Sequence, residues 1–299
     1  MSPRIALWTL LSAALALTAC DDGGGDDGGA DAAAPAGPTL VAYTGEVPAL
    51  PADPDHDDLS FFPLDPGGVW RYRKQTAAWQ SPPPVSQGAE VTLRAGDAAD
   101  QRVRRTVVRF NLGRDGETVP VEQVVEEVFQ LTPDMPPSKG PGINVAAVTV
   151  EERVIADGSL VRRLERTYTP PYALVRDVRA VDRGDTNLET PMVRLTEVLT
   201  VGSGEPESNE GIITARVETE RNDKTLPIEG NYRSKVRELH VFDDFNASNT
   251  RTLWLQQGVG PVQWALQSAD NITFTLVATN HDPDWAVPPP PPEEDAGAE

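Results

Sequence analysis

The sequence predicts an all-β fold, a single antiparallel domain of about ten strands arranged as a curved half-barrel or a sandwich. Two patterns support this prediction. Short segments in which apolar and polar residues alternate recur along the chain, as in strands that bury one face. Short turns rich in Gly, Asp and Pro separate these segments. The body that carries them, residues 59–281, is long enough to bury one sizeable core and shows no clear internal repeat or second domain boundary.

The first strands follow one another at the start of this body. Trp70 and Tyr72 are two residues apart, so a strand here places both side chains on one face. Residues 89–95 alternate, with a valine and a leucine on the same face. Residues 102–110 carry valines among arginines and are expected to form the next strand.

The middle of the body contains one ambiguous segment and one clear hairpin. Residues 121–129 fit helical spacing as well as a strand. We expect a strand, because valine is dense there and because Thr132 precedes a proline. Asp157-Gly158, between the alternating residues 145–155 and 159–168, is the strongest hairpin signal in the chain. Further strands are expected at residues 192–201, 212–220, 232–242, 251–255, 262–267 and 272–278.

The N-terminus has the three parts of a secretory signal, namely the basic Arg4, an apolar run over residues 5–17 and small residues after it. The tetrapeptide that ends at Ala19-Cys20, Leu-Thr-Ala-Cys, resembles the lipobox of bacterial lipoproteins. This resemblance implies that the chain is cut between Ala19 and Cys20 and that Cys20 receives a diacylglycerol thioether. Residues 1–19 would then be a lipoprotein signal peptide, and the membrane would be bound through the lipid.

Two alternatives remain open, a cleaved signal without a lipid and an uncleaved membrane anchor. The apolar run is shorter than the roughly 20 residues that cross a bilayer. Cys20 is the only cysteine in the chain, and an unpaired thiol is a liability in an oxidising compartment unless it is capped. We therefore expect a protein of the cell envelope, lipid-anchored to the inner or outer membrane, with its body facing the periplasm or the cell surface.

Most of the formal charge of −20 lies outside the body. Residues 20–58, rich in Gly, Asp and Pro, are predicted to be a disordered tether after the lipid, and residues 282–299 a disordered proline-rich and acidic tail. Residues 1–58 and 282–299 together carry −15, which leaves −5 on the body. Asp21 stands where enteric lipoproteins carry the signal for inner-membrane retention. Because the sequence contains no basic patch that could bind phosphates, nucleic acid is not expected as a partner.

Two motifs in the body are more specific signals than its overall composition. Residues 61–72 run from Phe-Phe-Pro-Leu through a glycine turn to Trp70 and Tyr72, and residues 253–262 place Trp254 before the turn Gly258-Val-Gly260. Both are similar to motifs of a group of exported bacterial β-domains, TapB-like and related. The two motifs lie near opposite ends of the body, so the resemblance spans nearly all of it. It implies a β fold and no mechanism, with the five named residues as structural or pocket-lining positions.

The chain departs from that pattern at two positions. Pro261 follows the second glycine of the turn, and Gly68 stands where asparagine is more usual.

The sequence predicts no catalytic residue. The three histidines read as a solvated linker residue (His56), a hydrogen-bonded strand residue (His240) and a residue at the fraying end of the body (His281). No nucleophile elbow is present, and Ser203 lies in a glycine turn. Adjacent carboxylates such as Glu126-Glu127, Glu151-Glu152 and Asp243-Asp244 face opposite sides of a strand. No cofactor and no metal are predicted, although the acidic segment around His56 offers ligand atoms.

These observations favour a binding or scaffolding role in the envelope without catalysis. One form places Trp70, Trp254 and Trp264 on a concave face that holds an apolar ligand or a lipid, and in the other form they fill the core. The alternatives are an envelope hydrolase and an accessory subunit of an envelope protein complex. The expected partners are the membrane and either an apolar ligand or an envelope protein.

Overall fold

The computed structural model describes residues 60–75, 88–114, 117–133, 141–180, 187–220, 224–228, 231–245, 251–266 and 272–281. Within these ranges the regular structure consists of thirteen strands and no helix. The strands are β1 (Val69–Gln75), β2 (Gly88–Ala95), β3 (Gln101–Arg114), β4 (Glu117–Thr132), β5 (Gly142–Val154), β6 (Leu160–Val175), β7 (Asn187–Val201), β8 (Glu207–Thr219), β9 (Lys224–Ile228), β10 (Asn231–Phe242), β11 (Arg251–Gln256), β12 (Gly260–Leu266) and β13 (Ile272–Thr279).

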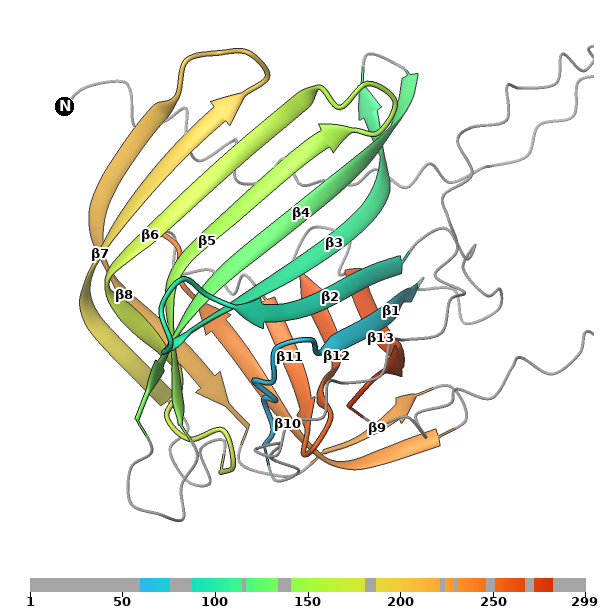
Figure 1. The fold of residues 1–299 in the computed structure, drawn as a ribbon, viewed down its shortest axis with the longest axis vertical. Coiled ribbons are helices and arrows are strands. Elements are labelled where there is room, and N and C mark those ends of the chain that lie inside the picture. The colour runs from blue at the N-terminus through green and yellow to red at the C-terminus, as the bar shows by residue number, and fades with distance from the viewer. Residues whose placement is uncertain are drawn as a thin grey trace, which may run out of the picture.

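The strands form a closed antiparallel barrel (Figure 1). β10 closes the ring, because its second half pairs with β8 on one side and with β11 on the other. The first half of β10 pairs with β9, which in the described part of the chain has no other neighbour, so twelve strands make up the barrel. The prediction of an all-β antiparallel fold is confirmed. The prediction of about ten strands in a half-barrel or a sandwich is wrong, since closure pairs the edges that those folds leave open.

One side of the barrel is much taller than the other (Figure 1). β3 to β8 are 13 to 16 residues long, whereas β1, β2 and β11 to β13 have 6 to 8 residues. At about 3.3 Å per residue, the longest strands extend roughly 50 Å and the short ones roughly 25 Å. We call β3–β8 the tall wall. The tall wall extends past the ends of the short strands on the opposite side of the barrel.

Local turn chemistry explains the tight hairpins of the tall wall. Between β5 and β6, Gly158 has φ 70° and Ser159 donates its backbone N–H to Asp157 Oδ1 at 2.9 Å. The predicted Asp157-Gly158 hairpin is therefore confirmed. The ambiguous segment 121–129 lies within β4 and pairs with both β3 and β5, so its prediction as a strand is also confirmed.

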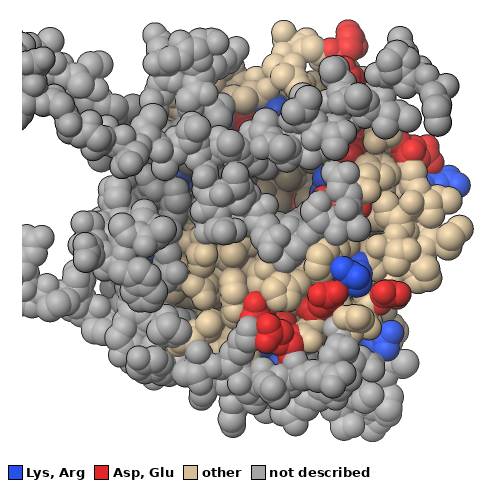
Figure 2. Space-filling model, turned by 180° about the vertical axis from the view of Figure 1, so that it is seen from behind, with Lys and Arg blue, Asp and Glu red and all other residues tan. Residues whose placement is uncertain are grey.

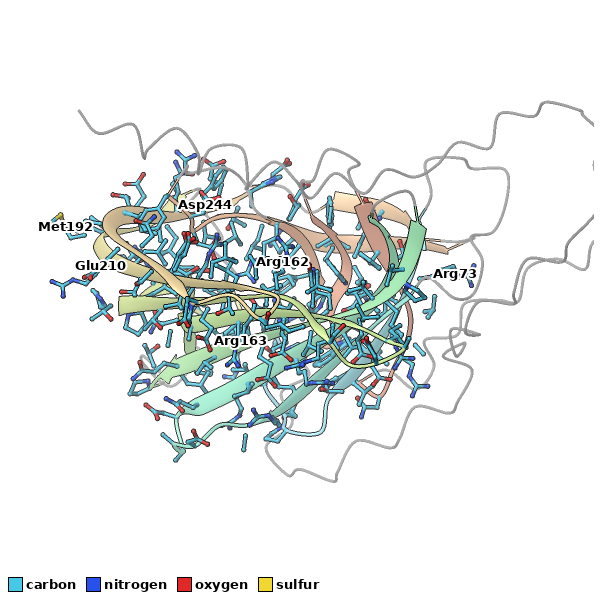
Figure 3. The ribbon with its side chains drawn as sticks, turned by 90° about the horizontal axis from the view of Figure 1, so that it is seen from above. Arg73, Arg162, Arg163, Met192, Glu210 and Asp244 are labelled. Atoms are coloured by element: carbon cyan, nitrogen blue, oxygen red, sulfur yellow. The ribbon has the colours of Figure 1, made fainter. Side chains whose placement is uncertain are left out.

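Successive side chains of the tall wall face alternately into the barrel and out of it. Arg162 and Arg163 show this on β6, where they lie on opposite sides of the strand (Figure 3). Arg162 pairs inside with Glu152, whose side chain is 5% exposed, while Arg163 pairs outside with Glu165. On the face seen in Figure 2, acidic and basic side chains of the described residues are interspersed rather than gathered by sign. Such exposed pairs contribute about 0–1 kcal/mol each.

The segment that precedes β1, residues 60–68, crosses one end of the barrel, and we call it the plug. Phe61 donates its backbone N–H to Val178 after β6, at 2.7 Å, and Gly67 donates to Leu93 at the end of β2, at 2.8 Å. Phe61 and Phe62 are each 2% exposed and belong to the core. Burying each ring stabilises the fold by about 1.5–3 kcal/mol. The plug thus ties together strand ends from separate parts of the ring.

Candidate functional site

The two sequence motifs bind each other at the end of the barrel that the plug crosses. Trp70 and Tyr72 both point inward from β1. Trp70 Nε1 donates to the backbone carbonyl of Val259 at 2.6 Å, and the Tyr72 hydroxyl donates to the carbonyl of Pro261 at 2.7 Å. Both acceptors belong to the Gly-Val-Gly turn and its return strand, 189 residues away in the chain. We call this pair of contacts the latch. Burial raises the pKa of Tyr72, so its hydroxyl stays a donor.

Glycine is required at two positions beside the latch. Gly260 has φ 90°, and a Cβ there would lie 3.0 Å from Pro63 in the plug. A Cβ on Gly68 would lie 2.5 Å from His281 Nε2 and 2.8 Å from the Trp70 ring. The second clash gives a physical reason for glycine at position 68. Gly258 has φ 76° and donates its N–H to Ser60 in the plug at 2.7 Å.

The three tryptophans considered for a ligand face do not share one surface. Trp70 is 3% exposed and stacks on His281, with ring centroids 4.6 Å apart. Trp264 is 9% exposed and stacks on Phe274, with centroids 4.2 Å apart. Trp254 lies on the opposite face of the sheet, since its neighbour Leu253 pairs with Trp264. The three tryptophans therefore do not line one concave face, and Trp70 and Trp264 fill the core, as the other of the two alternatives expects. His281 is likewise buried rather than at a fraying end.

Two arginines inside the barrel lie over the rings of the plug. The Arg104 guanidinium is 5.5 Å from the centroid of Phe62 and 5.3 Å from that of Phe129. Arg237 lies 5.6 Å from the Phe61 centroid. Cations placed over aromatic faces in a desolvated interior contribute up to about 2 kcal/mol each. Burial lowers the pKa of Arg104 to about 10, while nearby Tyr72 opposes that change.

A buried carboxylate joins two of the interior cations. Glu127 on β4 is 2% exposed and accepts a hydrogen bond from Arg104 Nε at 2.6 Å. Its other oxygen accepts from Arg251 at the start of β11. Burial lowers the pKa of Arg251 to about 9, and the neighbouring charge of Arg104 adds to this. The carboxylate pairs with both guanidinium groups, which lowers the free-energy cost of burying them in a low-dielectric interior.

A bulge in β6 brings two tyrosines to a second buried carboxylate. Between the pairs Val145↔Tyr172 and Ala147↔Thr167, four residues of β6 oppose one residue of β5. Tyr172 then donates to Asp243 Oδ2 at 2.6 Å, and the Tyr168 hydroxyl lies 3.3 Å from the same oxygen.

Both tyrosines are held in the protonated form. Burial raises the pKa of Tyr168 and of Tyr172, and the charge of Asp243 raises both further. Arg251 links the two halves of the network, because it donates to the Tyr172 hydroxyl at 3.0 Å. The interior network as a whole consists of Arg104, Glu127, Tyr168, Tyr172, Asp243 and Arg251.

The tall wall carries two further inward ion pairs above and beside this network. Arg162 binds Glu152 with two hydrogen bonds of 2.7 Å, and Gln123 donates to the same carboxylate at 2.8 Å. Arg166 Nε donates to Glu197 Oε2 at 2.6 Å. All these carboxylates are engaged by cations or amides. The arrangement therefore holds these charges in place inside the barrel.

The side chains considered for catalysis are not brought together. His240 lies in β10 and is hydrogen-bonded, as predicted. Ser203 is exposed in the β7–β8 turn, and β8 separates it from His240 by roughly 36 Å of extended chain. Glu126 and Glu127 face opposite sides, with side chains 39% and 2% exposed. The described residues thus do not assemble the serine triad or the paired carboxylates weighed from the sequence.

One group of metal-ligating side chains occurs among the described residues. Glu220, Glu238 and His240 place one potential ligand atom each within 4.8 Å of one another. They lie on the outer face of the barrel, because their neighbour Leu239 faces the core. No prediction from the sequence includes this group. Its signal is present only as a Glu-Leu-His alternation in a strand.

Three sequence-predicted positions fall outside the described residues: the cleavage pair Ala19 and Cys20, and His56. No helix of the described part of the chain has the length and apolar character needed to cross a membrane. The buried charges of the interior network were also not predicted from the sequence. Their only signal in the sequence is that Glu127 stands two residues from Val125 and from Phe129, at a position of the alternation that is otherwise apolar.

The geometry therefore defines a latch, a plug and a charged interior network, and the comparisons add no relative to them. No family model, curated protein or solved structure matches this chain.

Proposed function

We propose that this chain is a lipid-anchored protein of the bacterial cell envelope whose barrel is a non-catalytic scaffold that binds another envelope protein. The N-terminal signal with Leu-Thr-Ala-Cys20 supports the anchor. The resemblance of the two motifs to exported β-domains supports the same compartment. A scaffold needs a stable body and an accessible surface, and both have support in the described residues.

The observation that carries the scaffold role is the latch. Trp70 and Tyr72 of the first motif donate hydrogen bonds to Val259 and Pro261 of the second motif, and Gly258 donates to Ser60 in the plug. The interior network is likewise engaged in internal ion pairs. The most distinctive residues of the chain thus stabilise the body, which favours a scaffold over a carrier whose aromatic residues contact a lipid.

The surface feature that supports a protein partner lies on the outer side of β7 and β8. Met192 and Ile212 are 69% and 62% exposed, the largest values among the large hydrophobic side chains of the described residues. Arg194, which pairs with Ile212 in register, forms an ion pair with Glu210 at 3.3 Å. Met192 and Glu210 lie together at the outer edge in Figure 3. Apolar side chains rimmed by charges are typical of protein-binding surfaces.

Met192 also has a left-handed backbone, with φ 58°, at a bulge in β7. A residue with a side chain rarely adopts this conformation, and it costs on the order of 1–3 kcal/mol. The strain turns an apolar side chain outward, which fits a contact residue better than a core residue.

In vivo photo-cross-linking tests the scaffold role. A photoreactive amino acid placed at Ile212 of the full chain is expected to capture one defined envelope protein. The matched control is the same amino acid at Arg163 on the outer face of β6, which pairs with Thr200 of β7, six residues along that strand from Arg194, the register partner of Ile212. A discrete adduct at position 212 and none at 163 supports the proposal. No adduct at 212, or turnover of ester or glycoside substrates by the purified chain, would favour the carrier or hydrolase alternatives instead.

A further inference from the structure

We propose that Glu220, Glu238 and His240 bind a divalent transition-metal ion, Zn²⁺, on the outer face of the barrel where β8, β10 and β11 meet. This site is independent of the scaffold role, since none of the three residues belongs to the latch, the plug or the interior network.

The strand register places the three ligands on one surface. Glu220 follows the last residue of β8, and its backbone N–H donates to the carbonyl of Glu238 at 3.1 Å. Glu238 and His240 are two residues apart in β10 and therefore share a face. The inward residues between them, Thr219 and Leu239, pair with each other. The core side of the sheet thus fixes the spacing of the ligands on the outer side.

The distances suit a small ion. His240 Nε2 lies 3.1 Å from Glu238 Oε1, and the potential ligand atoms of all three residues lie within 4.8 Å of one another. Two ligands at about 2.0 Å from a tetrahedral zinc are about 3.3 Å apart. Glu238 and His240 already have this separation. Glu220 is exposed, so a change of rotamer can bring its carboxylate to the same distance.

A further hydrogen bond orients the imidazole. His240 Nδ1 lies 3.1 Å from Thr252 Oγ1, and the two residues pair directly between β10 and β11. With the proton on Nδ1 donated to the threonine hydroxyl, Nε2 keeps its lone pair for a metal. Metal-binding histidines commonly use a partner of this kind to fix the ring and its tautomer.

The local charge favours a cation. Glu218 pairs with His240 in register, so it faces the same region as Glu220 and Glu238. Arg216, which forms an ion pair with Glu218 at 3.2 Å, is the cation of β8 that borders the group. The hydrogen bond to Glu238 raises the pKa of His240, despite partial burial, and the charges of Glu238, Glu220 and Glu218 add to the effect. The negative charges that stabilise a proton on the imidazole also stabilise Zn²⁺ at the same place. Zn²⁺ must displace that proton when it binds.

The donor set selects the class of metal. One imidazole with carboxylates suits zinc and its neighbours, whereas Mg²⁺ and Ca²⁺ prefer oxygen ligands throughout. Three protein ligands leave a fourth position of a tetrahedral ion open to water or to a group from a partner.

Competition with a chromophoric zinc chelator measures the proposed site. The full chain is titrated with Zn²⁺ alone, for the wild type and for the variants His240→Ala, Glu220→Gln and Glu238→Gln. We expect one site in the wild type and at least about tenfold weaker binding in each variant. Glu220 is exposed, so Glu220→Gln tests a ligand with little risk to folding. Circular dichroism verifies that each variant is folded.

Two controls distinguish zinc binding at the proposed group from zinc binding elsewhere on the chain. Glu210→Gln removes an exposed carboxylate of β8 outside the group, and it is expected to leave the affinity unchanged. His56→Ala tests the acidic segment before the body, which offers alternative ligands. Affinity is expected to rise with pH as His240 loses its proton. Wild-type affinity in folded His240→Ala and Glu220→Gln, or a loss of binding in His56→Ala alone, would overturn the proposal.

Discussion

Glu127→Gln is expected to be strongly destabilising, because it removes the carboxylate that joins two buried cations. Glu127 is 2% exposed and contacts both Arg104 and Arg251. Breaking a buried ion pair by removing one partner costs about 3–5 kcal/mol. Asp243 Oδ2 lies 3.8 Å from Arg251 and offsets part of one charge. We therefore expect the lower end of that range, about 3 kcal/mol.

Urea unfolding followed by tryptophan fluorescence measures this difference, since the chain has six tryptophans. With a slope of about 1–3 kcal/mol per molar urea, the loss lowers the midpoint by about 1 M or more. The matched control is Glu122→Gln, which removes the outer partner of Arg109 in a pair where both side chains are 31% exposed. That change should cost less than about 1 kcal/mol. Equal midpoints for the two variants would refute the reasoning that the interior network stabilises the barrel.

Three further predictions concern the plug, the second carboxylate and the outer histidine. Phe62→Ala should lower the free energy of unfolding by about 3–5 kcal/mol in the same assay, because the Phe62 ring of the plug is buried in the core. A loss below about 1 kcal/mol would show that the plug is dispensable for stability. Tyr172→Phe removes the 2.6 Å hydrogen bond to Asp243 and should cost about 1–3 kcal/mol, again by urea unfolding, while an unchanged midpoint would contradict the bond. The pKa of His240 is raised by its bond to Glu238, so the stabilisation from the imidazolium is complete below the unfolded pKa and is lost as pH rises through the higher folded pKa. Midpoints of wild type and His240→Gln in the absence of metal should therefore differ most at acidic pH and converge at alkaline pH, and a constant difference would argue against the ion pair.

Local patterns in the sequence predict most of the strands. Alternation identifies β2, β5 and β6, and turn chemistry identifies the hairpin at Gly158. Valine density with a proline after Thr132 decides correctly between helix and strand for β4. The long strands of the tall wall extend several residues beyond their predicted ends, because pairing on both sides stabilises residues whose own pattern is weak. β9 was not predicted, since its five residues form a strand only through β10.

Long-range features could not be predicted from these patterns. Closure depends on β10 pairing with β8 and β11 together, and no local signal specifies that contact. Glu127 and Arg251 are 124 residues apart, so nothing in their neighbourhoods shows that they meet. The latch is the intermediate case. The sequence identifies Trp70, Tyr72 and the glycine turn as unusual and places the first two on one face, but their hydrogen bonds across 189 residues appear only in the structure.

Intact-mass analysis of the native product from its own bacterium tests the central proposal of an envelope-anchored scaffold most directly. The account predicts a mature chain that begins at Cys20 and carries a diacylglycerol group, with the mass of the acyl chains added. It also predicts that Cys20→Ser abolishes this modification and releases the protein from the membrane fraction. A native product with an unmodified thiol at Cys20, or one that retains residues 1–19, would contradict it.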